Sequence, residues 1–339
     1  MKEDHMNISE KALKGKDAVQ YLEKKLGFSH DILTSFPKYI MIETVNFCNA
    51  ECIMCGIDFD KKVKAVMKDD LFNKITEEIA QHKDKIEKVM LYLDCEPILD
   101  KKLPARIEMM KKAGVKKVNI STNAELLDVV RGTKIINAGL DEIYINLDSL
   151  HKDRFEAIRK RLHFETVYKN IIDFIELRNK LNPKLVIRMQ MILQELNADE
   201  GETWHDHWKT KLNSNDQIIV QKAHNWASVV NTKFGEEFAI NNIPCIGPFG
   251  TFCIHVDGTV GLCSMDTEPN GSTGEGIGSV ALKSIAQVWT DERVNKVRAK
   301  HIAGERCDIK LCDGCTLWRE DKHIIEEILK PHANTANKS

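Results

Sequence analysis

Charge of one sign and long apolar runs are both scarce in this sequence. Its 339 residues carry 49 Lys and Arg against 51 Asp and Glu, a formal net charge of −2. A near-neutral chain lacks the basic surface that binds nucleic acid, so we expect no nucleic-acid partner. No apolar run approaches the roughly 18 residues of a membrane span, and the charged N-terminus lacks the apolar region of a signal peptide. We therefore expect a cytoplasmic protein with no membrane partner.

Cysteine, in contrast, is plentiful, with ten residues in the chain. Disulfides are rare in a reducing compartment, so this number indicates metal binding or catalysis. The length of 339 residues allows a main domain and a smaller one. Residues 1–38 are polar, with a helical pattern over 17–26, and predict an N-terminal helical cap or arm that is too short for a peptide-leader-binding domain.

From residue 39 to 226, short β-rich runs alternate with amphipathic segments of helical periodicity. This alternation is typical of repeated βα units, which build a parallel sheet with helices packed against it. The predicted strands lie at 39–44, 87–93, 117–121, 142–147, 185–192 and 217–221. The predicted helices lie at 69–83, 103–114, 125–138, 164–181 and 201–211.

Three cysteines, Cys48, Cys52 and Cys55, follow the first predicted strand at C-x3-C-x2-C spacing. Thiolates bind soft iron and zinc, and a cubane iron–sulfur cluster normally takes four of them. Three close together can hold three irons and leave the fourth open to another ligand. The alternatives are a zinc knuckle or chance clustering, but structural zinc normally has four protein ligands.

This spacing directly after a first strand resembles the radical S-adenosylmethionine (SAM) superfamily. The resemblance implies an α/β fold, a partial (β/α)6 TIM-like barrel over residues 39–226. It also implies a 4Fe–4S cluster on the three cysteines, whose open iron chelates SAM. Reduction of that cluster splits SAM into methionine and a 5′-deoxyadenosyl radical. In barrels of this kind, chemistry gathers at the C-terminal ends of the strands.

Further segments at predicted strand ends resemble the SAM-binding motifs of the family. Residues 93–99, Leu-Asp-Cys-Glu-Pro-Ile-Leu, resemble its Gly-Gly-Glu-Pro motif, with Asp94 and Cys95 in place of the glycines. Residues 121–124 and 146–149 resemble its Ser-Thr-Asn-Gly and Ser-Leu-Asp-Gly segments. By this resemblance the cofactor-binding residues are Glu96, Pro97, Ser121, Asn123, Asn146 and Asp148. Arg188 on the fifth strand is predicted either to bind the SAM carboxylate or to form a structural salt bridge.

After the last strand, Lys222, His224 and Asn225 are predicted either to line a substrate pocket or to form an ordinary linker. Farther along, Cys245, Gly258 and Cys263 match the C-x9–15-G-x4-C signature that opens the SPASM domain of certain radical SAM enzymes. Asp257-Gly258 predicts a hairpin turn between the two cysteines.

A helical stretch over 282–302 follows, and Cys312 and Cys315 form a C-x2-C pair. No cysteine follows Cys315, which resembles the shortened twitch form of the domain with one auxiliary cluster. The resemblance implies a small C-terminal domain (β-hairpin plus helix) at 227–325, in which Cys245, Cys263, Cys312 and Cys315 hold a second 4Fe–4S cluster. Zinc is the alternative for this site. Residues 326–339 form a polar tail.

Cys95, Cys253 and Cys307 remain outside these ligand sets. Cys253 and Cys95 are candidate catalytic hydrogen-atom donors, as in radical epimerases, although a small buried thiol is the simpler interpretation. Cys253 or Cys307 could also replace one of the four predicted auxiliary ligands. Cysteine spacing alone leaves both choices open.

By this resemblance the chain is an oxidoreductase- or epimerase-type enzyme that abstracts a substrate hydrogen. The missing leader-binding domain favours a small hydroxylated substrate, a carbohydrate or an aminocyclitol. The alternative is radical modification of a ribosomally made peptide or protein, and a more remote one is a non-catalytic iron–sulfur protein. An external one-electron reductant, flavodoxin or ferredoxin, is the expected partner besides the substrate.

Overall fold

The computed structural model describes residues 13–59, 62–231, 243–268 and 276–317, together with residues 324 and 328. The first twelve residues and almost all of the predicted tail at 326–339 therefore lie outside the described residues. Within the described part, no helix is long and apolar enough to cross a membrane.

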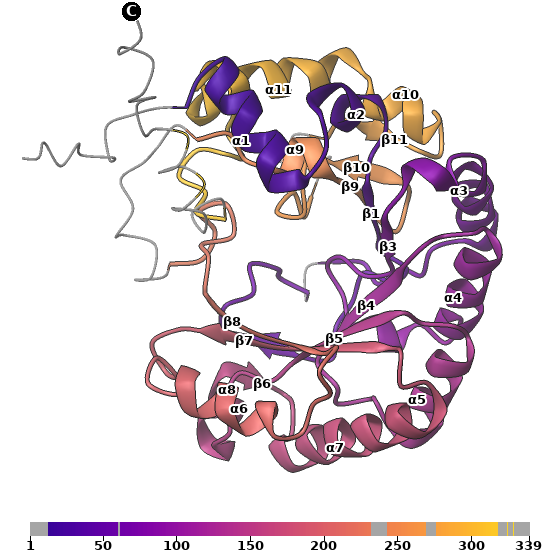
Figure 1. Cartoon of the computed structure of the whole chain (residues 1–339), viewed down its shortest axis with the longest axis vertical. Coiled ribbons are helices and arrows are strands. Elements are labelled where there is room, and N and C mark those ends of the chain that lie inside the picture. The colour runs from indigo at the N-terminus through magenta and orange to yellow at the C-terminus, as the bar shows by residue number, and fades with distance from the viewer. Residues whose placement is uncertain are drawn as a thin grey trace, which may run out of the picture.

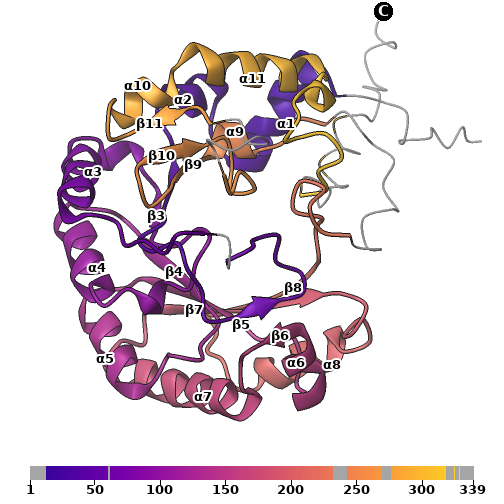
Figure 2. The same ribbon diagram turned by 180° about the vertical axis from the view of Figure 1, so that it is seen from behind.

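A curved sheet of parallel strands surrounded by helices forms the larger part of the protein (Figure 1). The strands run in the order β1 (Tyr39–Ile42), β3 (Lys88–Met90), β4 (Val118–Thr122), β5 (Glu142–Asn146), β7 (Val186–Leu193) and β8 (Gln217–Lys222). The covering helices are α3 (Asp69–Gln81), α4 (Leu103–Lys112), α5 (Val129–Asn137), α7 (Phe164–Leu181) and α8 (Gly201–Lys209). Seen from behind, α3, α4, α5 and α7 follow one another around the outside of the strands (Figure 2). The predicted partial (β/α)6 barrel is confirmed.

Alternating side chains explain why these segments form strands. Ile40, Val89, Ile120 and Ile143 are fully buried on the outer face, where they pack in the core under the helices. Burying one such side chain stabilises the fold by about 1.5–3 kcal/mol. The residues between them face the barrel interior and are largely polar, which fits a curved, open sheet whose inside holds a site rather than a second core.

Charged and aromatic side chains fill the interior at the N-terminal ends of the strands. The Lys88 ammonium pairs with Glu142 and donates to the Tyr144 hydroxyl at 3.1 Å. The Arg188 guanidinium lies over the Tyr144 ring, 4.7 Å from its centroid. Because these paired charges occupy the base of the barrel, the opposite end is the one left for ligands.

The C-terminal segment extends the same sheet beyond β1. Strand β9 (Thr251–Ile254) pairs in parallel with β1, and β10 (Thr259–Gly261) and β11 (Gly278–Ser279) follow in antiparallel order. The predicted hairpin is confirmed, and Gly258 adopts φ +88° at its turn, a conformation that favours glycine. The C-terminal hairpin is thus continuous with the barrel sheet.

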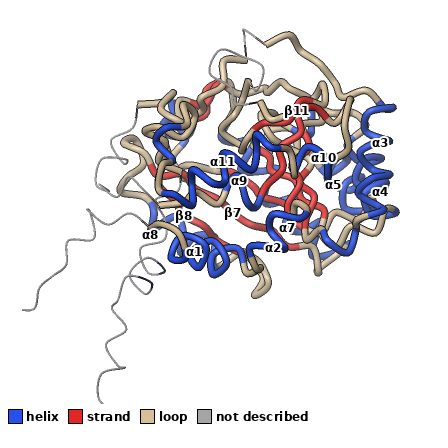
Figure 3. Tube along the Cα trace, turned by 90° about the horizontal axis from the view of Figure 1, so that it is seen from above, coloured by secondary structure: helices blue, strands red, loops and turns tan. Residues whose placement is uncertain are grey.

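Helices from both ends of the chain pack together beside this hairpin. Helices α1 (Lys16–Leu26) and α2 (His30–Ser35) contact α9 (Gly247–Gly250), α10 (Ile285–Trp289) and α11 (Glu292–Ala303). Figure 3 looks onto this end of the molecule, with α9 and α11 above the strands. The single helix predicted over 282–302 was wrong in detail. Asp291 accepts a hydrogen bond from the Arg293 backbone N–H and caps a new helix there.

Among the elements that the sequence analysis did not predict are two short strands and a helix next to the cysteine loop. β2 (Glu51–Cys52) pairs in antiparallel order with β6 (Arg159–Lys160), which directly follows α6 (Lys152–Ile158). A strand of two residues is too short to show the alternation of apolar and polar residues by which strands are predicted. This pairing fixes the cysteine loop against the segment after β5.

Candidate functional site

The loop after β1 holds Cys48, Cys52 and Cys55 at the C-terminal end of the barrel. The Cys55 backbone N–H donates to the Cys52 carbonyl at 3.0 Å, and the Ala50 N–H donates to the Cys48 sulfur at 3.4 Å. None of the ten cysteines, all of which lie in the described ranges, forms a disulfide. The loop therefore presents three free thiols.

All three thiols line a cavity of about 210 Å³ above the strand ends. Of the predicted cofactor residues, four also line it, namely Glu96, Ser121, Asn123 and Asn146. Pro97, Asp148 and Arg188 are not among the described residues that line this cavity. The cavity thus gathers the cysteine loop and the ends of β3, β4 and β5 around one space.

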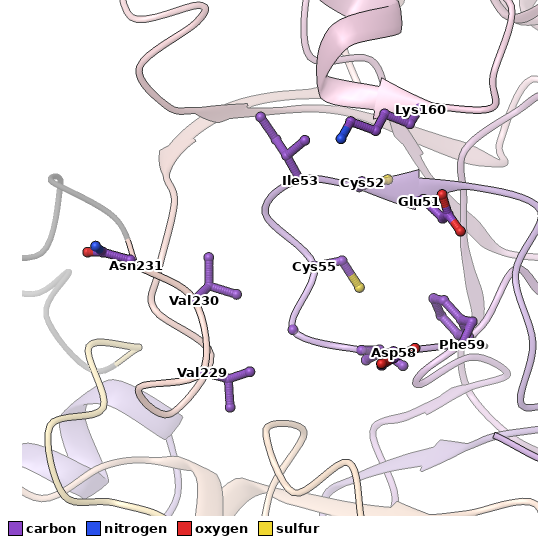
Figure 4. Close-up of a pocket in the computed structure, with 12 residues that line it drawn as sticks. Glu51, Cys52, Ile53, Cys55, Asp58, Phe59, Lys160, Val229, Val230 and Asn231 are labelled. Atoms are coloured by element: carbon purple, nitrogen blue, oxygen red, sulfur yellow. The ribbon is translucent and has the colours of Figure 1, made fainter. Parts of the chain in front are cut away.

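A second cavity of about 590 Å³ adjoins the other side of the cysteine loop. Cys55, Lys160, Val229 and Val230 are among the residues that line it. Figure 4 shows the two valines, from the segment after β8, beside the cysteine loop, and the Cys55 sulfur turned toward Phe59. Glu51 and Asp58 add carboxylates to its wall. This space has the size and the mixed lining of a small-molecule site.

Glu96 connects the turn after β3 to the end of β4. One carboxylate oxygen accepts from the Ile98 N–H at 3.1 Å and from the Thr122 hydroxyl at 2.8 Å, and the other accepts from the Asn123 N–H at 2.8 Å. Burial raises the pKa of Glu96 to about 7, against the three hydrogen bonds that lower it. The carboxylate is therefore rigidly aimed while its charge is only partly compensated, which suits a cationic ligand group.

Polar side chains on three neighbouring strands form a hydrogen-bonded row beside Glu96. The Asn146 amide donates to the Ser121 hydroxyl at 3.0 Å and accepts from the Gln190 amide at 3.1 Å. Asn123 donates to Asn49 at 2.8 Å, next to Cys48. Hydroxyl and amide groups held in this way can both donate to and accept from a ligand's hydroxyl groups.

The departure from the family's double glycine is resolved by side-chain direction. Asp94 is 2% exposed and pairs with Lys62 at 3.3 Å, outside the described lining of the small cavity. Cys95 points the other way and is part of that lining. The turn therefore accommodates both side chains without closing the cavity.

Arg159, on β6, is the site residue that sequence reasoning missed. Its Nε donates to Asp148 at 2.5 Å, and its Nη1 lies 3.5 Å from the Cys52 sulfur. Arg159 lines the small cavity, whereas Arg188 stacks on Tyr144 below and its Nε has no hydrogen-bond partner among the described residues. The basic run Arg159-Lys160-Arg161, which begins eleven residues after Asp148, was the sequence feature that could have identified it.

The segment after β8 closes the site from the C-terminal side. His224 and Trp226 line the small cavity. Asn225 instead donates to the Gly314 carbonyl at 2.7 Å and exchanges hydrogen bonds with Thr316. Of the three residues predicted there, His224 faces the cavity and Asn225 anchors the segment next to Cys315.

The four predicted auxiliary cysteines converge beside α9 and α11. The pKa of Cys245 is raised to about 11, mainly by burial and to a smaller extent by the neighbouring Cys315 thiol. Burial and the neighbouring Cys245, Cys253 and Cys312 thiols likewise raise the pKa of Cys263. Cys245, Cys312 and Cys315 are each less than a tenth exposed. The four sulfurs thus form one buried group drawn from three segments.

His301 on α11 contacts two of these cysteines. Its Nδ1 accepts from the Cys245 backbone N–H at 3.0 Å, which leaves the ring proton on Nε2, 3.6 Å from the Cys312 sulfur. Cys253 lies on β9, fully buried and outside the described lining of the small cavity. Cys307 is half-buried in the turn at Arg306–Asp308.

The donor sets of both groups fit iron–sulfur clusters. Each set consists of sulfur alone, which selects soft metals rather than magnesium or calcium. N–H groups face the sulfurs of both sets, from Arg159 at Cys52 and from His301 at Cys312. Such donors stabilise thiolate and tune a cluster's reduction potential.

Comparison with known families gives two matches. The model of the radical SAM superfamily matches residues 42–205, and that of SPASM, an iron–sulfur cluster-binding domain, matches residues 245–316. The first match contains the three-cysteine loop, and the second contains all four auxiliary cysteines. The boundary between them falls close to the segment after β8.

Solved structures with the same fold include BtrN in complex with AdoMet and 2-DOIA, with a TM-score of 0.55, 17% identity, and coverage of 82% of this chain and 92% of that one. Streptococcus suis SuiB bound to the precursor peptide SuiA has a TM-score of 0.63 and 14% identity, over 84% of this chain and 70% of that one. AdoMet-bound anSMEcpe has a TM-score of 0.60 and 13% identity, over 87% of this chain and 97% of that one. These likenesses establish the fold.

A curated relative, GTP 3′,8-cyclase of Listeria welshimeri, is 30% identical over 161 residues, which cover 45% of this chain and 44% of the relative. The Dictyostelium discoideum molybdenum cofactor biosynthesis protein 1 is 25% identical over 49% of this chain and 26% of its own length. The chain thus matches less than half the length of these relatives.

Proposed function

Because the chain belongs to the radical SAM superfamily and carries a SPASM domain, we propose that it oxidises or epimerises a small hydroxylated substrate by radical chemistry. The chain is a radical SAM enzyme, and its cofactors are a SAM-binding 4Fe–4S cluster, an auxiliary cluster and SAM. The observation that carries the substrate proposal is the cavity of about 590 Å³ beside Cys52 and Cys55. Its Glu51, Asp58 and Lys160 side chains suit hydroxyl and amine groups.

In this proposal Cys48, Cys52 and Cys55 hold the first cluster, and Cys245, Cys263, Cys312 and Cys315 hold the auxiliary cluster in a twitch-like arrangement. When bound, the two clusters would supply the electron for reductive cleavage of SAM and an acceptor for a second electron.

The chain's own residues bind and orient SAM. Glu96 would bind its amino group, and Ser121, Asn123 and Asn146 would bind its hydroxyl groups. Arg159 lines the cavity and is better situated than Arg188 to meet the SAM carboxylate. Pro97 fixes the turn that carries Glu96, and Asp148 holds the Arg159 guanidinium. His224 and Trp226 cover the cavity and keep water from it.

Two residues bear on the reaction's outcome. If the substrate carbon is epimerised, a thiol must return a hydrogen atom, and the thiyl radical that remains takes one electron from the external reductant and a proton. Cys95 is favoured over Cys253 because it lines the small cavity of about 210 Å³ next to the cysteine loop, whereas Cys253 is not among the described residues that line either cavity. If a C–H/O–H unit is oxidised to a ketone, no thiol is required. Replacing Cys95 by Ser therefore distinguishes the routes: loss of product with unchanged 5′-deoxyadenosine formation would support epimerisation.

An external one-electron reductant and a substrate are the partners that radical SAM chemistry requires. We propose flavodoxin or ferredoxin as the reductant, and the cytoplasm as the location, since ten thiols need a reducing compartment. Modification of a peptide is the second candidate. It is favoured by the fold shared with SuiB, which was solved with its precursor peptide.

The first experiment measures iron and 5′-deoxyadenosine after anaerobic reconstitution. Cys52→Ala is expected to lower iron from about eight to about four per chain and to abolish 5′-deoxyadenosine. Cys312→Ala is expected to lower iron similarly and to retain SAM cleavage. Retained 5′-deoxyadenosine in Cys52→Ala would refute the central assignment. A panel of sugars, aminocyclitols, GTP and peptides, read by substrate-stimulated 5′-deoxyadenosine, then separates the substrate classes.

A further inference from the structure

Three buried side chains converge where the barrel meets the C-terminal hairpin. Glu43 follows β1, Asp94 follows β3 and His255 follows β9, so they come from three adjacent strand ends. Each offers one oxygen or nitrogen atom, and these atoms lie within 4.8 Å of one another. The three residues are 1%, 2% and 5% exposed. They lie on the side of the β3 turn that faces away from the small cavity, which Cys95 lines.

Their hydrogen bonds are incomplete. Glu43 Oε2 accepts from the Val256 backbone N–H at 2.9 Å and lies 3.6 Å from His255 Nδ1. Glu43 Oε1 and His255 Nε2 are buried and have no hydrogen-bond partner among the described residues. A buried polar atom without a partner costs about 1–3 kcal/mol, so native proteins rarely keep one. His255 Nε2 lies toward Gly261 and Asp266, so Glu43 Oε1 is the unpaired atom that points to a ligand of this group.

The two carboxylates of the group attract cations. Two carboxylates, Glu43 and Asp94, are buried together, and the Lys62 ammonium stands 3.3 Å from Asp94. Lys62, Glu43 and His255 also line a cavity of about 260 Å³, with Glu268 at its exposed rim. That cavity gives an ion a path from solvent, and Lys62 is the group that an entering ion would displace.

We propose that Glu43, Asp94 and His255 bind one divalent transition-metal cation, such as Mn²⁺, Fe²⁺ or Zn²⁺, at a site separate from both iron–sulfur clusters. Carboxylate and imidazole ligands suit these ions. Bonds of about 2.1 Å require ligand atoms roughly 3–3.5 Å apart, which small side-chain rotations achieve from the present spacing. The cation joins the end of β1, the turn beside SAM and the hairpin, so it fastens the C-terminal domain to the cofactor cavity.

The test uses the full chain with both clusters reconstituted, so that the cluster cysteines are occupied. After chelator treatment, Mn²⁺ is added and its free fraction is followed by the six-line electron paramagnetic resonance signal. We expect one Mn²⁺ per chain with a Kd below roughly 100 μM, released on addition of Zn²⁺. Glu43→Gln, which keeps an acceptor for the Val256 N–H, is expected to weaken binding at least tenfold, with unchanged iron content.

Two further variants separate ligand loss from general damage. Lys62→Gln removes the competing ammonium and is expected to tighten Mn²⁺ binding several-fold, whereas an unfolding effect would loosen it. Glu268→Gln removes an exposed carboxylate at the rim of the same cavity and is expected to leave the Kd unchanged. Absence of stoichiometric Mn²⁺ and Zn²⁺ binding, or equal affinity in wild type and Glu43→Gln, overturns the proposal. The group is then an ion network neutralised by Lys62 and a protonated His255.

Discussion

Replacing Arg159 by Leu tests the buried ion pair that holds the cysteine loop. Arg159 Nε donates to Asp148 at 2.5 Å, and the two side chains are 10% and 0% exposed. Removing one partner of a buried pair costs about 3–5 kcal/mol, because the other charge is left without compensation. In the variant, Asp148 still accepts a hydrogen bond from the Ile192 N–H at 2.8 Å, which reduces the cost of its unpaired charge by about 1 kcal/mol. The expected loss in unfolding free energy is therefore about 3 kcal/mol.

The assay is urea unfolding of the cluster-free, thiol-reduced protein, so that metal binding adds nothing to stability. Arg131→Leu is the matched control, since its pair with Asp128 is about half exposed and contributes at most about 0.5 kcal/mol. The double variant Arg159→Leu/Asp148→Asn has no unpaired buried carboxylate at this position. Its free energy of unfolding should therefore be about 2 kcal/mol higher than that of Arg159→Leu. A single-variant loss below about 1 kcal/mol, or a double variant no more stable than the single, would refute the reasoning.

Three further outcomes follow from the site. The pKa of Glu96 is raised from 4.5 to about 7, so the folded cluster-free chain holds a proton that the unfolded chain releases between these values. The free energy of unfolding should therefore fall by about 3 kcal/mol as the pH rises from 4.5 to about 7. The urea midpoint of Glu96→Gln should change less with pH over this range than that of the wild type. His301→Leu removes the N–H facing Cys312 and should lower the auxiliary cluster's reduction potential by roughly 20–60 mV in a redox titration, an unchanged potential contradicting the contact. Gly247→Ala places a Cβ 2.9 Å from that of Cys263 and should reduce auxiliary iron while 5′-deoxyadenosine formation persists; full iron would show that the cysteine can move.

The barrel strands were predictable because apolar residues recur along their outer faces. The strand predicted at 117–121 differs from the observed β4 by one residue at each end, and that predicted at 142–147 differs from β5 by one residue at its C-terminal end. The break between α10 and α11 was missed because the apolar pattern continues through it, and only the capping carboxylate of Asp291 marks the new start. Hydrophobic periodicity locates elements well and their ends less well.

The cysteine positions could be read from spacing, but the surroundings of the thiols could not. Arg159 lies 107 residues from Cys52 in sequence, and the two meet only through the β2–β6 pairing. His301 reaches Cys245 over 56 residues through the packing of α11. Local patterns carry no information about such contacts, because tertiary packing alone creates them. The sequence also could not predict that the Asp94 side chain points away from the cavity, because this direction depends on its ion pair with Lys62 in another loop.

The parallel pairing of β1 with β9 has a consequence for how the chain is made. Strand β1 ends at Ile42, whereas its partner on that side begins at Thr251, so a ribosome adds more than two hundred residues before the edge of β1 can be covered. Until then the cysteine loop emerges beside an unpaired strand edge, a state prone to mispairing. Cluster loading during synthesis would therefore meet an uncovered β1 edge, and formation of β9 would be the event that covers it.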